Sequence, residues 1–256
     1  MRRVIFNQKG GVGKSSIASN LAAISAVRGR DTLLVDLDPQ GNSSQYLLGD
    51  AWESAESDMA AFFSDALSIR ILPRDPLQYL TPTEFEGLHI LASSPELAEL
   101  QTKLEARHKI YKLRELLLKL SEQFDNIYID TPPAFSFYTL SALIAADACL
   151  IPFDCDDFSR RALYTLLENV DETRADHNPE LEVEGIVINQ FLARANLPQQ
   201  LVEELLEEGL PVLGTRLSSS VKMRESHQQC LPLIHLAPRH KLTLEFVALF
   251  EELERP

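Results

Sequence analysis

Short apolar runs rich in Val, Ile and Leu alternate along this chain with longer stretches in which apolar residues recur at helical spacing. The short runs are nearly continuous in apolar residues, as is typical of parallel strands that are covered on both faces. They predict strands at residues 3–6, 32–36, 88–91, 126–130, 148–152, 184–188 and 212–215. The stretches between them predict helices at 14–28, 95–107, 111–123, 137–145, 160–174, 198–208, 221–230 and 241–254.

Regular alternation of strand and helix predicts right-handed βαβ units. The fold class is therefore α/β, a doubly wound, mostly parallel sheet with helices on both faces. Residues 41–87 are the least regular part, and we expect loops and short helices there, over one edge of the sheet. No internal repeat or low-complexity linker interrupts the pattern, so residues 1–256 are predicted to form a single domain.

A glycine-rich loop follows the first predicted strand and reads Lys-Gly-Gly-Val-Gly-Lys-Ser-Ser over residues 9–16. It matches the phosphate-binding pattern G-x-x-x-x-G-K-[ST], except that Gln8 occupies the first glycine position. Backbone N–H groups at the start of the following helix favour an anion. We therefore expect ATP and Mg²⁺ here, with Lys14 on the phosphates and Ser15 on the metal. The remaining predicted nucleotide contacts are Lys9, Gly10, Gly11, Val12, Gly13 and Ser16.

Two further motifs place carboxylates just beyond predicted strands. Asp38 lies in Asp-Leu-Asp-Pro-Gln-Gly-Asn after the second strand, and Asp130 ends the strand at 126–130. Ligands of doubly wound sheets bind outside the carboxyl ends of the strands, so both acids should face the phosphate loop. Mg²⁺ is held by few carboxylates together with phosphates and water. We expect Asp130 to support the metal behind Ser15, and Asp38 to orient or deprotonate the attacking water near that metal.

Composition limits the classes that remain. A net charge of −14 opposes nonspecific binding to nucleic acid or anionic membranes over most of the surface. No run of about 18 apolar residues is present, and the N-terminus enters a strand directly, so neither a membrane span nor a signal peptide is expected. The cysteines (Cys149, Cys155 and Cys230) form no C-x-x-C pair. We therefore expect a cytoplasmic protein in which they are reduced thiols that contribute to packing.

Taken together, KGGVGKS, VDLDPQGN and DTPP resemble the ParA/MinD family of deviant Walker ATPases, and most of all its small ParA/Soj-like branch. The resemblance extends to residues 185–189, 217–222 and the last helix. It implies that Lys9 is the signature lysine, which crosses an ATP-sandwiched homodimer to the partner's nucleotide. It also implies that Asp38 is the hydrolytic aspartate, that Asp130 belongs to the second acidic motif, and that Asn189 lies near the adenine.

The chain departs from the family pattern at three places. Ser15 and Ser16 replace the usual pair of threonines, which keeps the hydroxyl that Mg²⁺ needs. Serines replace a proline and an asparagine before Val221, on the adenine side of the expected site. The chain also lacks an N-terminal helix-turn-helix extension, so site-specific operator binding is not expected.

Nonspecific DNA binding is the branch behaviour that the resemblance implies, through Arg194 and Lys222, with Arg224, Arg239 and Lys241 extending the patch. Glu203, Glu204, Glu207 and Glu208 oppose it, and the basic stretch 103–119 is interpreted as a solvated helix face. The acidic last helix argues against membrane binding.

Other relatives of the fold fit less well. A nitrogenase iron protein needs cysteines at a dimer axis, and a tyrosine kinase needs a tyrosine-rich tail. An amidating cobyrinate synthase needs a glutaminase domain, for which 256 residues leave no room. Three functions stay open. The first is a DNA-positioning ATPase that a ParB-like or adaptor protein stimulates. The others are a regulatory ATPase that binds only proteins, and an ATP-dependent ligase.

Overall fold

A single eight-stranded sheet runs through the molecule in the order β3-β4-β2-β5-β1-β6-β7-β8. The computed structural model describes residues 1–55, 57–68, 74–154, 159–192 and 196–255. In chain order the strands are β1 (Arg2–Ile5), β2 (Thr32–Asp36), β3 (Thr81–Pro82), β4 (Leu88–Leu91), β5 (Asn126–Asp130), β6 (Ala148–Asp154), β7 (Glu182–Phe191) and β8 (Val212–Ser218). All neighbours pair in parallel except β3, which is antiparallel to β4. The predicted fold class is confirmed.

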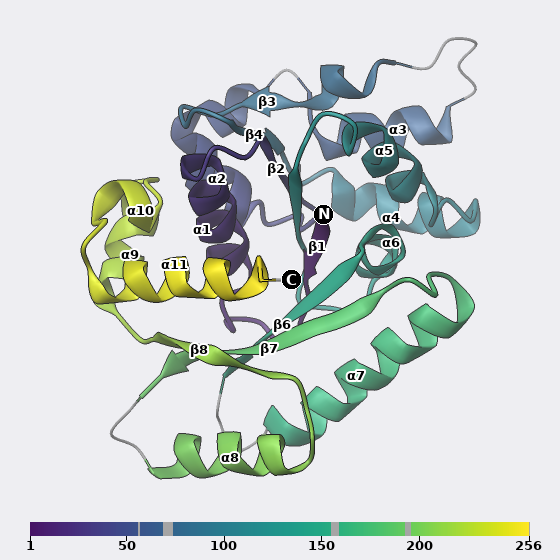
Figure 1. Cartoon of the computed structure of the whole chain (residues 1–256). Coiled ribbons are helices and arrows are strands. Elements are labelled where there is room, and N and C mark those ends of the chain that lie inside the picture. Colours follow the sequence, from purple (N-terminus) through teal and green to yellow (C-terminus); the bar gives the residue numbers. More distant parts are fainter. Residues whose placement is uncertain (56, 69–73, 155–158, 193–195, 256) are drawn as a thin grey trace.

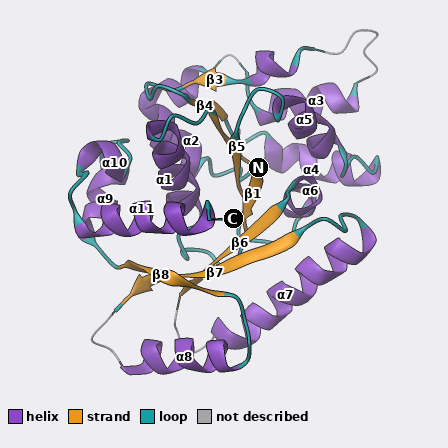
Figure 2. Ribbon diagram, viewed as in Figure 1, coloured by secondary structure: helices purple, strands orange, loops and turns teal. Residues whose placement is uncertain are grey.

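Helices cover both faces of this sheet, as Figures 1 and 2 show. They are α1 (Lys14–Val27), α2 (Asn42–Leu48), α3 (Met59–Leu67), α4 (Leu97–Ala106), α5 (Lys112–Leu120), α6 (Phe137–Ala145), α7 (Ser159–Asp176), α8 (Asn196–Glu207), α9 (Val221–Gln228), α10 (Leu233–Leu236) and α11 (Lys241–Leu253). Helices α1, α10 and α11 share one hydrophobic core, and α3 to α8 contribute to the core on the other face. The apolar side of the last helix therefore packs on the sheet, as predicted.

The segment that the sequence left irregular is built from short pieces. It holds α2, α3 and β3, together with two short 3-10 helices, η1 (Gly49–Ser54) and η2 (Pro76–Tyr79). The strand β3 caps the β4 edge of the sheet, so the expectation of short elements over one edge agrees with the structure. No helix in the described ranges combines the length and apolar character needed to cross a bilayer.

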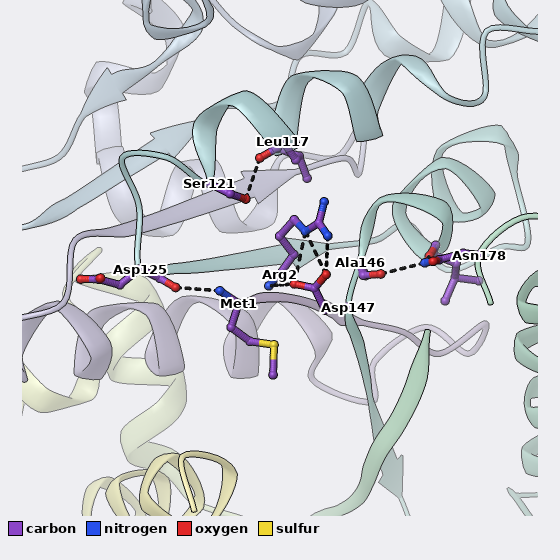
Figure 3. Close-up of polar contacts among 9 residues, drawn as sticks. Met1, Arg2, Leu117, Ser121, Asp125, Ala146, Asp147 and Asn178 are labelled. Atoms are coloured by element: carbon purple, nitrogen blue, oxygen red, sulfur yellow. Dashed lines mark hydrogen bonds and ion pairs between the residues drawn. The ribbon is translucent and has the colours of Figure 1, made fainter. Parts of the chain in front are cut away.

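Polar contacts hold the amino ends of the central strands in place (Figure 3). The N-terminal ammonium of Met1 donates to the Asp125 carbonyl oxygen at 2.8 Å, and the Arg2 guanidinium forms an ion pair with Asp147. The Arg2 backbone N–H also donates to Asp147 Oδ2 at 2.7 Å. These contacts fix the start of β1, whose other end leads into the glycine-rich loop.

Candidate nucleotide site

The glycine-rich loop turns back under the carboxyl ends of the strands and delivers the chain into α1. Gly11 and Gly13 have φ values of 79° and 89°, which side chains with a Cβ rarely adopt. Gly13 precedes Lys14, the first residue of α1, so unpaired backbone N–H groups open toward the loop. The local geometry is that of an anion cradle at a helix N-terminus.

The two lysines of the loop occupy different positions. Lys14 is only 6% exposed, and its Nζ donates to the Lys9 carbonyl oxygen at 3.1 Å, inside the loop. Burial lowers the pKa of Lys14, while the nearby Asp130 and Asp38 favour its charged form. The side chain of Lys9 is exposed at the mouth of the loop. The structure therefore assigns one lysine to the interior of the site and the other to its outer surface.

A hollow of about 320 Å³ lies directly above the loop, and we call it the phosphate hollow. It brings together most of the loop residues predicted from sequence with Asp38 and several residues that were not predicted. Its lining residues are Gly10, Gly11, Gly13, Lys14, Ser15, Ser16, Asp38, Gln40, Asn42, Pro133 and His227.

Asp130 lies behind the hollow at the end of β5 and is fully buried. Its Oδ2 accepts a hydrogen bond from Ser43 Oγ at 2.7 Å, while its Oδ1 has no hydrogen-bond partner among the described residues. Burial raises the pKa of Asp130 to about 6, although the hydroxyls of Ser15 and Ser43 and the Lys14 ammonium favour the ionised form. Burial therefore makes the ionised carboxylate costly, and a bound cation would offset that cost.

Asp36, the last residue of β2, lies beside Asp130 in the ladder and was not predicted as a site residue. Burial, together with the charge of Asp130, raises the pKa of Asp36 well above its usual range. Its Oδ2 accepts from both the backbone N–H and the hydroxyl of Ser44, each at 2.8 Å. The adjacent acids thus share one buried, low-dielectric environment.

Asp38 stands two residues past the end of β2 and lines the hollow. Its backbone N–H donates to Asp36 Oδ1 at 3.1 Å, and its Oδ1 accepts from the Gln40 N–H at 3.0 Å. Gly41, further along the same turn, has a φ of 64° and is covered by the Trp52 indole. A Cβ at Gly41 would lie 2.1 Å from the indole ring, so the turn fits closely under Trp52. The Asp38 carboxylate is therefore held on a well-defined turn.

The end of β7 holds the loop from the other side. Asn189 Nδ2 donates to the Val12 carbonyl oxygen at 2.8 Å, and Gln190 Nε2 donates to the Gly11 carbonyl oxygen at 3.0 Å. Gln190 adopts a φ of 54°, a strained value for a non-glycine residue. Asn189 thus positions the phosphate loop, a role that the resemblance did not imply.

A second hollow of about 270 Å³ adjoins the first, and we call it the side hollow. Its lining residues are Gly11, Gly13, Ser16, Asn189, Gln190, Ser218, Ser219, Ser220, Val221, Met223, Arg224, Leu242 and Phe246. It shares Ser16 and the loop glycines with the phosphate hollow, so a ligand that extends beyond its phosphates would enter it. Asn189 lines it, and its position beside a base stays a prediction.

The structure describes all of the predicted DNA-binding cations except one. Arg194 lies outside the described residues. Lys222, in α9, forms an ion pair with Glu225, and the exposed Arg224 lines the side hollow. Arg216, which was not predicted, lies over the Phe191 ring at 4.7 Å. Arg216, Arg239 and Lys241 also line a shallow depression on β8 and α11.

The donor set fits a small divalent cation. Oxygen ligands suit Mg²⁺, and the hollow offers the Ser15 hydroxyl and the Asp38 carboxylate, with the unpartnered Oδ1 of Asp130 behind them. A buried carboxylate oxygen without a partner is costly unless a proton or a cation compensates it. The residues present therefore fit the metal.

Fold and loop together define a P-loop nucleotide-binding protein. The family model AAA_31, described as an AAA domain, matches residues 3–183. The chain is 38% identical to the chromosome partitioning protein ParA of Myxococcus xanthus over 78% of this chain and 69% of that protein. It is 30% identical to the sporulation initiation inhibitor protein Soj of Bacillus subtilis, over 93% of this chain and 91% of that one. This chain belongs to the ParA/MinD family.

A similar solved structure is a cobyrinic acid a,c-diamide synthase from Mycobacterium smegmatis with a bound ATP analog and magnesium. The TM-score is 0.84 at 23% identity, covering 98% of this chain and 92% of that one. At that identity the likeness shows the fold alone.

Proposed function

We propose that this chain is a ParA-like ATPase in which Mg²⁺-ATP joins two copies, the dimer binds DNA without sequence preference, and hydrolysis releases it. The observation that carries the proposal is the division between the two loop lysines. Lys14 is buried inside the loop, whereas the Lys9 side chain is exposed at the mouth of the loop. A lysine at the mouth can instead bind the nucleotide of a second subunit.

Mg²⁺ would be held by Ser15, with Asp38 and Asp130 as its nearby carboxylates, and would neutralise charge on the phosphates. The residues of this chain then do the remaining work. Lys14 and the loop N–H groups bind the phosphates, and Asp38 orients the attacking water. Membership of the family implies ATP hydrolysis in general. The slow turnover and the ParB-like or adaptor partner that stimulates it are parts of this proposal.

The dimer is tested by light scattering with a non-hydrolysable ATP analogue. We expect wild-type protein to dimerise with the analogue and to stay monomeric with ADP. Lys9→Ala should still bind a fluorescent ATP analogue but fail to dimerise, whereas Lys14→Ala should lose nucleotide binding. A Lys9→Ala protein that dimerised as well as wild type would contradict the proposal.

Hydrolysis is tested at Asp38. Asp38→Ala should bind ATP and dimerise yet hydrolyse ATP poorly, because phosphoryl transfer depends mainly on positioning and charge stabilisation. Wild-type turnover itself should lie well below the roughly 1–100 s⁻¹ that is typical of kinases. Unchanged turnover in the variant would make Asp38 a structural residue.

A second candidate, a regulatory ATPase that binds only proteins, is favoured by the charge distribution. The net charge is −14, and Lys222 and Lys241 are both paired with glutamates on their own helices. A confirmed dimer that bound no duplex DNA would favour this candidate.

An ATP-dependent ligase would instead consume ATP in proportion to a second substrate. On the leading proposal the protein is cytoplasmic and associates with the nucleoid when ATP is bound.

A further inference from the structure

Helix α9 faces the nucleotide site through its last turn. His227 lines the phosphate hollow, and its Nε2 lies 2.8 Å from the Ser16 hydroxyl oxygen in α1. Ser16 in turn lines both the phosphate hollow and the side hollow. The hydrogen bond therefore joins α9 to α1 at the place that a nucleotide extending through both hollows must pass.

The imidazole is held from behind. The rings of His227 and Tyr46 stack with centroids 4.2 Å apart and an interplanar angle of 26°. The Tyr46 hydroxyl contacts the Ser226 hydroxyl and accepts from Asn20 Nδ2 at 3.2 Å. Burial lowers the pKa of His227, so the ring is neutral near pH 7 and either partner of the Ser16 bond can donate. A ring fixed in this way can act as a positioning group.

The same helix carries cations at its other end. Lys222 and Arg224 lie five and three residues before His227, and Arg224 and Met223 line the side hollow. Because α9 is only eight residues long, a shift of its last turn also moves its first. A nucleotide in the two hollows thus meets α9 at both ends.

We propose that the Ser16–His227 hydrogen bond is the contact through which a bound nucleotide fixes the position of α9, which makes His227 a positioning residue for the site. The inference rests on the proposed function in that ATP occupies these hollows. The inference goes beyond the proposed function because it names α9 as the element that responds to ATP and His227 as the residue through which α9 responds. Lys222 and Arg224 would then be presented differently with and without nucleotide.

The first measurement is a double-mutant cycle on the affinity for a fluorescent ATP analogue. His227→Ala should weaken binding about fivefold, the value of one ordinary hydrogen bond. In the Ser16→Ala background the same change should cost less than about twofold, because the partner is already gone. His227→Gln retains a polar group that can reach Ser16 and should restore most of the affinity. His235→Ala, at a histidine of α10 that stacks on Phe85 and lines neither hollow, is the matched control and should have no effect.

The second measurement is hydrogen exchange of residues 221–228 at saturating ATP analogue. Wild-type protein should show slower exchange in α9 when the analogue binds, and His227→Ala should lose that protection although its site is full. Equal losses of affinity in both serine backgrounds would overturn the proposal, and so would α9 protection that persists in His227→Ala. Neither readout uses DNA, so a failure of DNA binding would remain a separate result.

Discussion

Two independent features of the structure, backbone conformation and close packing, require glycine at position 13. Its φ is 89°, and a Cβ there would lie 2.3 Å from Asn189 Nδ2. Gly209 has a similar φ of 77°, but a Cβ there would meet nothing within 4 Å. Both Gly→Ala changes should therefore lower stability by about 1–3 kcal/mol through backbone strain. Only Gly13→Ala should also displace Asn189 from the Val12 carbonyl.

We expect Gly13→Ala to reduce binding of a fluorescent ATP analogue more than tenfold, while Gly209→Ala binds as wild type does. Urea unfolding of both variants supplies the stability comparison. Wild-type affinity in Gly13→Ala would show that the loop tolerates the clash by moving Asn189 without consequence.

Asp130 makes stability depend on pH in an unusual direction. Its pKa rises from 3.8 to about 6 on folding, so between these values the folded state binds more protons than the unfolded state. The contribution of Asp130 to stability is therefore greatest at low pH and is lost as the pH rises through 6, by on the order of 1–3 kcal/mol. Asp36 acts in the same direction. Asp130→Asn, which stays neutral, should be more stable than wild type at pH 7.5.

Urea unfolding between pH 5 and 7.5 without nucleotide measures this effect. The wild-type midpoint should fall relative to the Asp130→Asn midpoint as the pH rises, because the variant lacks the titrating carboxyl while His227 and His235 act equally in both proteins. The variant should also lose Mg²⁺-dependent stabilisation by ATP, because a neutral amide cannot compensate the cation. A difference between the two midpoints that did not change over this interval would contradict the raised pKa of Asp130.

At the scale of elements, contacts of one buried arginine join four parts of the chain. Arg3 of β1 is 1% exposed, and its guanidinium donates to Glu184 of β7 at 2.5 and 2.6 Å. Glu254, just past α11, lies 3.8 Å away, and the Tyr128 hydroxyl accepts from Arg3 at 3.3 Å. Removing one partner of such a pair leaves a buried charge and costs about 3–5 kcal/mol.

Glu184→Ala should therefore lower the free energy of unfolding by roughly that amount. The change lies at the amino ends of the strands, away from both hollows, so nucleotide affinity should be unchanged at temperatures where the variant is folded. Glu182→Ala, at an exposed position of the same strand, is the control and should cost less than about 0.5 kcal/mol. A Glu184→Ala protein as stable as wild type would show that water reaches Arg3.

The sequence predicted the elements whose pattern is long and regular and missed the short ones. The bounds of β2, β4, β5 and α6 agree with the prediction, because apolar runs there stop at polar or turn-forming residues. The strand β7 extends past the predicted 184–188 to Phe191, since pairing with β6 and β8 continues through polar Asn189 and Gln190. The predicted helix 221–230 ends at Gln228, because Cys230 turns to a φ of 49°. Helix α10 has four residues and no periodic signal.

The residues of the site likewise fall into those that the sequence predicts and those that only the structure shows. Most of the loop residues and Asp38 could be placed at the hollow from sequence, because the loop and the turn of Asp38 are each a contiguous motif. Asp130 could be placed beside the loop from the predicted end of its strand alone. His227, Gln190 and Ser43 reach the site from elements far apart in sequence, and only the folded chain shows their contacts. The pairing of Asp36 with Asp130 depends on strand order, which the alternation of elements does not specify.

At the scale of the whole molecule, an acidic protein that binds DNA must do so through a few local cations. If Lys222 contacts a phosphate, it must leave Glu225, and each contact contributes about 0.9 to the slope of log K against log salt. In a dimer, Lys222→Ala should therefore flatten that slope by roughly two and weaken binding to any duplex sequence. Two weak patches on one dimer also explain a requirement for ATP.

Fluorescence anisotropy of a labelled duplex, titrated with salt in the presence of an ATP analogue, measures the slope. Lys119→Ala provides the matched control, because Lys119 is an exposed lysine of α5 on the opposite face of the sheet. The control should leave the slope unchanged. An equal effect of both changes would indicate that net charge, rather than a local patch, governs binding.

The indole that covers Gly41 gives this protein a built-in optical probe. Trp52 is the only tryptophan in the chain, and its Nε1 donates to the Ser93 carbonyl oxygen at 2.8 Å. The Ser93 hydroxyl donates to the Asp38 carbonyl oxygen, so the indole and the turn of Asp38 share one anchor. Any movement of that turn during a catalytic cycle must alter the surroundings of the ring. Stopped-flow emission from unlabelled protein can therefore time each step between ATP capture and phosphate departure.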